Sequence, residues 1–365
     1  MLEQGKISCT QTVYLLINLV GATAVVFLPA ITAQDAGRDA WMVPLLTTLP
    51  AIYLALVIAT LGKRYPGQTL IQYLQTALGT WPGKAAGLFY LFYFVHTNAF
   101  IIREFGELMI TIIMPETPLV VFHVLILLLC AWAIRGGLEV LARVMEFTWP
   151  LIIILFMTAI LLTANEIEPQ RLFPVLENGI MPIISASLAP TGWRGEIILL
   201  AMFLPFMARP REGGRCAIMA VVAIGVILTA DALINTAVFG PVVARMTFPT
   251  FSLVRMVSVA NFIERIDAVL VAIWVIGMFG KIALFYYATV LGAAQLANVK
   301  DYRPLVLPVG VLLAALSIYV AGNSKELVEH IAQIWPLFAY VFEYIAPTML
   351  LVLTVLKGRY TGSGS

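Results

Sequence analysis

The stretch PIISASLAPTGWRGEIILLAMFLPFM, residues 182–207, joins two apolar ends through a polar centre. Its ends are apolar enough to lie in lipid, whereas PTGWRGE at 190–196 holds a proline, two glycines, an arginine and a glutamate. Proline and glycine are the weakest helix formers, and charged side chains are costly inside a bilayer. The stretch therefore predicts a membrane span that is interrupted near its middle.

Composition indicates that most of the chain lies in a membrane. Of its 365 residues, 61% are hydrophobic and 12% are charged, and the mean hydropathy is +0.96. Soluble domains carry about 25% charged residues, so no aqueous globule could hide this much apolar surface. The net charge of +2 decides little, whereas the placement of the charges is informative. We therefore expect a polytopic, all-α membrane protein.

Apolar runs long enough to cross a bilayer recur along the chain. A helix crosses about 30 Å of hydrocarbon in roughly 20 residues. Two connections, 67–79 and 249–267, also have apolar residues at helical spacing. We expect helices there rather than plain loops, the first at the cytoplasmic interface and the second over the outer end of the bundle. The runs predict ten transmembrane helices, at 11–33, 39–61, 84–113, 118–134, 140–163, 182–207, 214–240, 266–297, 303–321 and 335–356.

Lysine and arginine residues in the connections predict the orientation of the bundle. Cytoplasmic loops of membrane proteins are enriched in these residues. The connections on the side of the N-terminus carry more of them than the connections on the other side, so we expect both termini to be cytoplasmic. The first group is Lys6, Lys63, Arg64, Lys84, Arg135, Arg143, Arg209, Arg211, Arg215, Lys300, Arg303, Lys357 and Arg359, and the second is Arg38, Arg171, Arg245, Arg255, Arg265 and Lys325.

The ten spans divide into two sets of five with opposite topology, because the first span runs outward and the sixth inward. Transporters built this way bind ligands at the midplane, between interrupted helices at matching positions. PTGWRGE interrupts the sixth span, and Gly21 followed by Pro29 marks the first. A proline kink relieved by packing alone is the alternative. We expect one domain over 1–360, with inverted repeats at about 7–163 and 178–321, a last helix at 335–356, and an appended tail at 361–365.

Ionisable side chains lie inside the predicted spans. Each charge at the bilayer centre costs about 2.5–3.5 kcal/mol on insertion scales, so these groups must be paired or hydrated. Arg103 and Glu107 are spaced i,i+4 and predict a structural salt bridge. The full set is Arg103, Glu104, Glu107, Glu146, Arg194, Glu196, Asp231, Lys281 and Glu343.

Lys281 lies about fourteen residues into the eighth span, which places it roughly 21 Å from the outer end at 1.5 Å per residue. Near the midplane, its ammonium can pair with Glu196 or Asp231. It can also stand in for a coupling ion, or carry a proton in a proton-coupled transporter. A static ion pair that holds the spans together is the alternative.

No metal, cofactor or enzyme motif is found in the sequence. Cys9, Cys130 and Cys216 lie far apart and predict neither a disulfide framework nor a metal site. His123 lacks the neighbouring Cys or carboxylate spacing of a metal ligand, and His330 falls in a predicted outer loop. We expect no catalytic residue, no resident metal and no nucleic-acid partner.

Several stretches, taken in their order and spacing, resemble the B subunits of bacterial spore germinant receptors, of the amino acid–polyamine–organocation transporter superfamily. The resemblance runs from Ile7 to Leu356. It is carried by ISCTQTVYLLINLVGA, AGRDAW, YPGQTLIQYLQTALG, REFGELM, PETPL, GGLEVLARVMEF, GEIILLAMFLPF, PTFSLVRMVSVANFIERIDA and IWVIGMFGKIALFYYATV.

The resemblance implies a five-plus-five inverted-repeat fold and a germinant-sensing role. A small germinant, an amino acid in the typical case, would bind at the midplane in the spore inner membrane, beside an A-type membrane subunit and a C-type lipoprotein. Both termini would face the spore core. Glu196 or an unwound carbonyl would hold the ammonium. The implied wall is Gly21, Ala22 and Thr23; Tyr93, His96 and Thr97; Thr191, Gly192 and Trp193; and Lys281 and Phe285.

Two other functions fit the same spans. A proton-coupled amino acid transporter could act alone, with transport that depends on Lys281. Under any of these functions, the candidate structural or coupling charges are Arg103, Glu107, Arg194 and Asp231. A passive pathway for water or ions is the third possibility.

Overall fold

The computed structural model describes Glu3, residues 5–256 and residues 266–358. This part of the chain is helical and contains no β-strand beyond one isolated bridge between Ile7 and Met207. The predicted all-α class is confirmed. Arg265, Arg359 and the tail 361–365 lie outside the described residues, as does the middle of the helix predicted at 249–267.

The helices follow the predicted spans closely. The first half contains α1 (Cys9–Ala36), α2 (Met42–Arg64), α3 (Leu70–Leu78), α4 (Thr80–Leu108), α5 (Leu119–Arg135) and α6 (Leu138–Leu162). The second half contains α7 (Met181–Ala186), α8 (Leu188–Gly195), α9 (Leu200–Phe203), α10 (Gly213–Phe239), α11 (Pro249–Arg255), α12 (Ile266–Leu296), α13 (Val306–Tyr319), α14 (Ser324–Glu329), α15 (Trp335–Tyr340) and α16 (Ala346–Leu356).

Short 3₁₀ and π segments join several of these helices. The 3₁₀ segment η5 (Glu196–Leu199) follows α8, and η6 (Leu204–Phe206) follows α9. Two π segments, η10 (His330–Ile334) and η11 (Val341–Ile345), flank α15 in the last span. Local π geometry in a helix is often found at functional sites.

By length and composition, six helices of the described chain can cross a membrane, or up to seven if the bent pair α5 and α6 is one span. The angle within that pair is 115°. The other predicted spans are the segmented run from α7 to η6 and the shorter apolar helix Arg303–Tyr319. All ten predicted segments are therefore helical, whereas the count of ten crossings stays a prediction.

The first span is not interrupted, so the expected break in it is wrong. Helix α1 runs from Cys9 to Ala36 through both Gly21 and Pro29. Pro29 has no N–H and cannot bond to the carbonyl of Val25, four residues earlier. The hydroxyl of Thr250 in α11 lies 2.9 Å from that carbonyl and 2.9 Å from Oδ1 of Asp231, so the two oxygens share its one hydrogen. A Cβ on Gly21 would lie 3.1 Å from Ile224, so this glycine serves close packing against α10.

The sixth span is segmented, but PTGWRGE itself is not unwound, which corrects the second expected break. Helix α8 covers Leu188–Gly195 and passes into η5 at Glu196, while the α-helix is interrupted earlier, at Ser187. The glycines allow close contact instead: a Cβ on Gly192 would lie 2.8 Å from Trp335, and one on Gly195 would lie 2.0 Å from Glu343. The stretch is buried in protein and does not face lipid.

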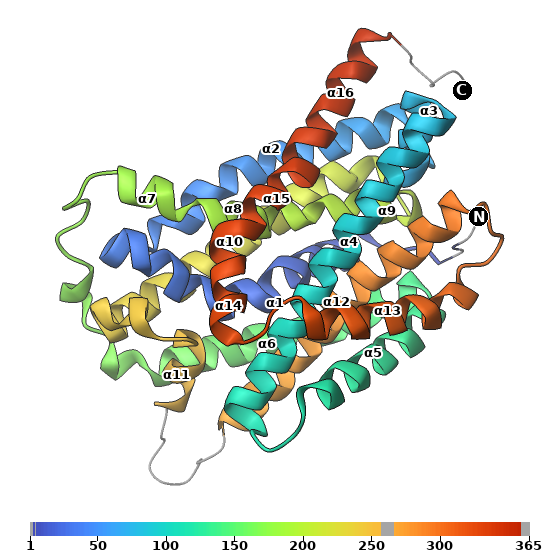
Figure 1. Ribbon diagram of the computed structural model, residues 1–365. Helices are drawn as coiled ribbons and strands as arrows, with labels where there is room; N and C mark the ends of the chain where they lie inside the picture. Colours follow the sequence, from blue (N-terminus) through green and yellow to red (C-terminus); the bar gives the residue numbers. More distant parts are fainter. Residues whose placement is uncertain (1–2, 4, 257–265, 359–365) are drawn as a thin grey trace.

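Helices α1 and α12 form the centre of the bundle, since their apolar windows are the most buried of the candidate spans. Figure 1 shows α3 and the end of α16 at one end of the bundle, with α7 and α11 at the other. Contacts agree with this arrangement: Lys6 donates to Pro205, Arg303 to the carbonyl of Arg135, and Lys357 to Ala77. The Lys- and Arg-rich connections therefore meet at one end.

The expectation of unlinked cysteines is also wrong. Cys9 and Cys216 form a disulfide across 207 residues of sequence, with Cα atoms 5.6 Å apart. Helices α1 and α10 pack side by side and bring their first turns together, which the sequence separation hides. Cys130 is a free, buried thiol.

Candidate functional site

A fully buried ion pair lies where α12 meets the sixth span. The Nζ atom of Lys281 is 2.7 Å from Oε2 of Glu196, and both side chains are enclosed by protein. The sequence allowed Glu196 or Asp231 as the partner of Lys281, and in the structure the partner is Glu196. An ion pair removed from water is stable only with good geometry and further hydrogen bonds. Thr23 supplies one such bond to Lys281, whereas, apart from the ion pair, Oε2 of Glu196 has no hydrogen-bond partner among the described residues.

Thr23 of α1 joins this pair to the tryptophan of PTGWRGE. Lys281 donates to Oγ1 of Thr23 at 2.6 Å, and Nε1 of Trp193 donates to the same oxygen at 2.9 Å. A hydroxyl oxygen has two lone pairs, so Thr23 can accept both bonds. One side chain therefore links α1, α8 and α12.

A small cavity lies beside the ion pair, with a volume of about 10 Å³. This volume is close to the minimum that one water molecule needs. An amino acid therefore does not fit in this closed arrangement. The lining consists of Thr97, Phe100, Ile101 and Glu104 from α4, Trp193 and Glu196 from the sixth span, and Ile331 and Trp335 from the last span.

Two polar atoms on the α4 side of the cavity lack partners. Oγ1 of Thr97 and Oε2 of Glu104 are buried and accept or donate no hydrogen bond among the described residues. A buried polar atom without a partner costs about 1–3 kcal/mol. The cavity therefore offers unused hydrogen-bonding capacity next to a charged pair, which is the property of a site for a small polar ligand.

Trp335 closes the cavity from the last span. Its ring centroid lies 5.4 Å from that of Trp193, and its edge lies against Gly192. Trp335 begins α15 directly after the π segment η10, which contributes Ile331 to the same wall. Movement of Trp335 and Ile331 away from α8 would enlarge the cavity.

A further buried carboxyl group, that of Glu343, lies in η11 of the last span. The hydroxyl of Tyr93 donates to Oε1 of Glu343 at 2.5 Å, and the ring of Tyr93 stacks on Phe342 with centroids 5.0 Å apart. Oε2 of Glu343 has no hydrogen-bond partner in the described chain. Tyr93 thus faces η11 and does not line the cavity.

The structure brings together five of the residues named from the sequence: Thr23, Thr97, Trp193, Glu196 and Lys281. His96 packs instead against Phe338, with ring centroids 4.6 Å apart. Phe285 packs against Phe94, the carbonyl of Thr191 accepts from Tyr344, and Gly192 supports Trp335. Gly21 and Ala22 line a different, apolar pocket.

Sequence reasoning missed Ile101, Ile331 and Trp335 as cavity residues, and noted Glu104 only as an intramembrane charge. The α4 residues could have been found, because positions 97, 100, 101 and 104 share one helical face. Nothing near Trp335 in the sequence marks it as a wall of this cavity, since its position depends on how the last span folds back.

The predicted salt bridge between Arg103 and Glu107 is confirmed, with Nη2 2.6 Å from Oε1. Arg103 also donates to the carbonyl of Ile318 at 3.1 Å, and Ser324 donates to Glu107. These bonds join α4 to α13 and α14. The pair therefore holds these helices together, and neither residue lines the cavity.

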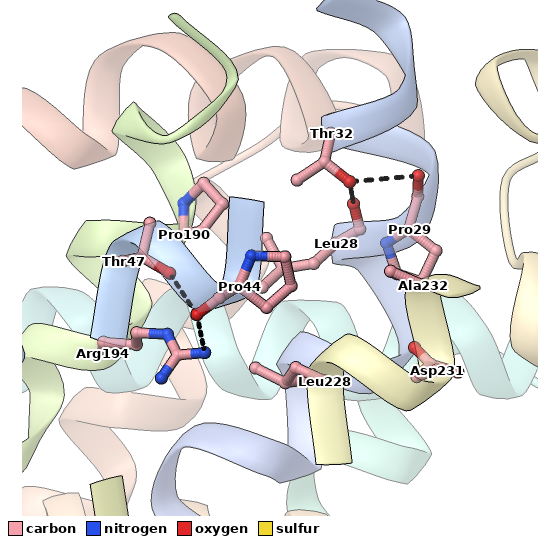
Figure 2. A pocket seen from close by; sticks show the side chains of 10 residues that line it. All are labelled: Leu28, Pro29, Thr32, Pro44, Thr47, Pro190, Arg194, Leu228, Asp231 and Ala232. Atoms are coloured by element: carbon pink, nitrogen blue, oxygen red, sulfur yellow. Dashed lines mark hydrogen bonds between the residues drawn. The ribbon is translucent and has the colours of Figure 1, made fainter. Parts of the chain in front are cut away.

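Arg194 and Asp231 line a separate cavity of about 10 Å³ (Figure 2). Nη2 of Arg194 donates to the carbonyl of Pro44 at 2.9 Å, and Asp231 bonds with Asn235 and Thr250. Figure 2 shows the two charged side chains on either side of Leu228. They form no ion pair with each other, so each is held by neutral groups.

Comparison with known proteins shows the family of this chain. The family model described as "Spore germination protein" matches residues 6–325. Spore germination protein KB of Bacillus subtilis (strain 168) is 28% identical over 364 residues, which cover 98% of this chain and 97% of the relative. Spore germination protein YndE of the same organism is 28% identical over 372 residues, covering 97% and 98%.

A solved structure shares the fold. The crystal structure of MhsT in complex with L-phenylalanine matches with a TM-score of 0.57 and 14% identity, covering 96% of this chain and 99% of that one. At this identity the likeness concerns the fold alone, which is a transporter-like bundle. With its long apolar helices, the protein is a multi-pass integral membrane protein. The chain belongs to the spore germination protein family.

Proposed function

We propose that this protein is the germinant-sensing subunit of a spore germinant receptor and binds a small amino acid in the cavity between Thr97, Glu104 and Trp193. The observation that carries the proposal is the buried pair of Lys281 and Glu196 beside unpartnered polar atoms. A zwitterion needs one cationic and one anionic partner, and this cavity has both kinds next to it. MhsT, whose fold is similar, holds L-phenylalanine.

The ligand's ammonium would bind between the carboxyl groups of Glu104 and Glu196, and its carboxylate would take the Lys281 ammonium as a partner. Free backbone N–H groups of the first span play no part in this binding mode, because α1 is continuous. Opening requires Trp335 to leave Trp193. A ligand that binds only the opened form would shift the population toward it, and partner subunits would detect that shift.

The same proposal covers the setting of the protein. The membrane is the spore inner membrane, with both termini on the spore-core side, where the Lys- and Arg-rich connections gather. The partners are an A-type membrane subunit and a C-type lipoprotein. The protein has a binding and signalling role and no enzymatic activity, in line with relatives whose names describe germination.

A proton-coupled amino acid transporter is the second candidate, and one observation favours it. Glu104, Glu196 and Glu343 are all buried near one cation, Lys281. If all three carboxyls were ionised, the cluster would hold an uncompensated negative charge in the membrane, which is costly. Bound protons would neutralise the excess, and a proton-coupled transporter would use them.

The test compares spores that carry the parent chain, Glu196→Gln or the control Glu166→Gln, which changes an exposed loop carboxylate. Germination is followed as a fall in optical density over a panel of L-amino acids. We expect Glu196→Gln to raise the half-maximal concentration while the control does not. An unchanged response would remove Glu196 from the site. Accumulation of labelled amino acid by vesicles under a pH gradient would favour the transporter.

A further inference from the structure

A disulfide bond ties the first turn of α1 to the first turn of α10. Cys9 is the first residue of α1, and Cys216 lies in the opening turn of α10, with the two Cα atoms 5.6 Å apart. The two helices also pack against each other. The bond lies at the end of the bundle where the Lys- and Arg-rich connections meet, since Lys6 lies shortly before Cys9 and Arg215 directly precedes Cys216.

Backbone hydrogen bonds beside the disulfide join the start of the chain to the end of the sixth span. The N–H of Ile7 donates to the carbonyl of Phe206 at 3.0 Å, and the N–H of Ala208 donates to the carbonyl of Ile7 at 2.8 Å. A Cβ on Gly213 would lie 2.1 Å from Leu204, so the sixth span also packs tightly against the start of α10. We call the disulfide and these two backbone bonds the N-terminal clamp.

The N-terminal clamp holds together the elements that carry the ion-pair site. Thr23 lies on the same unbroken helix as Cys9, about 21 Å further along at 1.5 Å per residue. Glu196 lies on the sixth span, which ends at Phe206 in the clamp, and the short connection at 208–212 leads from there into α10. An intact disulfide therefore keeps the start of α1 beside the end of the sixth span. Movements that widen the cavity are then confined to the opposite end of the bundle.

The two cysteines of the clamp differ in their access to solvent. Cys9 is partly exposed and lies between the exposed residues Ser8 and Thr10, whereas Cys216 is completely buried. Thiol–disulfide exchange needs a thiolate that reaches one sulfur atom of the bond. Sγ of Cys9 is therefore the atom that a reductant attacks, and Cys216 is the leaving group. In the orientation of the proposed function this end faces a reducing interior, where disulfides are usually transient or redox-sensing.

We propose that the bond between Cys9 and Cys216 is a redox-sensitive lock that a dithiol reductant opens. One thiolate of the reductant attacks Sγ of Cys9 and forms a mixed disulfide, while Cys216 leaves as a thiolate and takes up a proton. The second thiolate of the reductant then displaces Cys9, which takes up the other proton, and the reductant leaves as its own disulfide. Two electrons and two protons pass from the dithiol to the protein, so the step balances.

Reduction removes the covalent part of the clamp and leaves only its hydrogen bonds. Each of these bonds is worth about 0.5–1.5 kcal/mol net, so they open and close reversibly where a covalent bond does not. The start of α1 can then move away from Phe206 and from α10. Oxidised protein opens only at the end that carries α7 and α11 in Figure 1, whereas reduced protein can open at either end. The lock controls which side of the membrane the cavity can reach, and its state does not depend on a germinant.

Hydrogen–deuterium exchange on the full chain in lipid nanodiscs tests the lock in the absence of any amino acid ligand. The parent is either kept oxidised or treated with dithiothreitol, and exchange is followed by mass spectrometry in residues 7–12 and 204–216. We expect reduction to speed exchange in these two segments about tenfold or more. Exchange in α13 should stay the same. The comparison needs no variant and no germinant, so its outcome is separate from that of the proposed function.

Cysteine variants sharpen the test. Cys9→Ser cannot form the bond, so its exchange should match that of the reduced parent and should not respond to dithiothreitol. Cys130→Ser changes the free thiol and is the matched control, which should respond as the parent does. Equal exchange in the oxidised and reduced parent would overturn the proposal. So would a bond that dithiothreitol cleaves only after unfolding, or free Cys9 and Cys216 thiols in parent protein treated with an oxidant.

Discussion

Lys281 and Glu196 form an ion pair of 2.7 Å between α12 and η5, with both side chains excluded from solvent and lipid. The two residues lie 85 positions apart in the sequence, and Thr23 of the central helix α1 accepts a bond from the lysine. The pair therefore connects the segmented sixth span to the two most buried helices. Its integrity decides both the stability of the bundle and the charge of the adjacent cavity.

Lys281→Met should destabilise the protein strongly, because Glu196 would remain buried without its cation. Loss of one partner of a buried pair costs about 3–5 kcal/mol. Thermal unfolding in lipid nanodiscs measures the effect. Lys281→Met/Glu196→Gln should recover most of the loss, and Lys325→Met, at an exposed position, serves as the control. Equal unfolding temperatures for the single and double variants would contradict the pair's role.

Thr23→Val should leave two buried donors, on Lys281 and Trp193, without their common acceptor. The expected cost is about 1–3 kcal/mol for unsatisfied buried groups. Thr23→Ser keeps the hydroxyl and should restore most of the stability. Thr60→Val, which removes an exposed hydroxyl on α2, is the matched control. If serine and valine at position 23 behave alike, the hydroxyl does not bridge the two helices.

Gly195→Ala should be far more harmful than Gly277→Ala, although both change a helical glycine. A Cβ at 195 would lie 2.0 Å from Oε2 of Glu343, whereas at 277 its nearest contact would be 3.5 Å away. Overpacking costs about 1–3 kcal/mol, while an unhindered Gly→Ala change stabilises a helix. Unfolding measurements on Gly195→Ala/Glu343→Ala should show relief. Similar effects at the two glycines would rule out this close approach.

Thr250→Val should weaken α1 at Pro29 by leaving the carbonyl of Val25 without a donor. Pro29→Ala restores an N–H that can bond to this carbonyl within the helix, so the two changes should compensate in part. A double-mutant cycle of thermal unfolding gives the coupling, which we expect to be about 1 kcal/mol. Additive effects would mean that Thr250 does not replace the missing helical bond.

The sequence predicted the helical segments and the buried charge pairs well, because both follow from local rules. Runs of about 20 apolar residues mark spans, and i,i+4 spacing marks the bond between Arg103 and Glu107. The pairing of Lys281 with Glu196 could be predicted from the position of Lys281 near the membrane midplane, because a cation buried there needs an anionic partner. Asp231 was an equally suitable partner by this argument. Only the packing of α10 beside α11 shows that Asp231 bonds to Thr250 instead of Lys281.

The sixth span is segmented as predicted, but the position of its break and the break expected in the first span were wrong, because proline and glycine have more than one use in a helix. Pro29 is tolerated inside α1 because Thr250, from a distant segment, bonds to the freed carbonyl. Gly195 makes room for Glu343 and does not unwind the backbone. Neither role can be read without the neighbouring helix. The same holds for Trp335 and for the disulfide of Cys9 and Cys216, which depend on tertiary contacts.

Direct binding tests the central claim, that the ligand occupies the cavity beside Glu196 and Lys281. Purified parent, Glu104→Gln, Glu196→Gln and the control Glu166→Gln are titrated in nanodiscs with a panel of tritiated L-amino acids. We expect saturable binding of at least one amino acid to the parent and the control, and a Kd raised about tenfold or more in both cavity variants. The same Kd in all four proteins, or no saturable binding to the parent, would contradict the account.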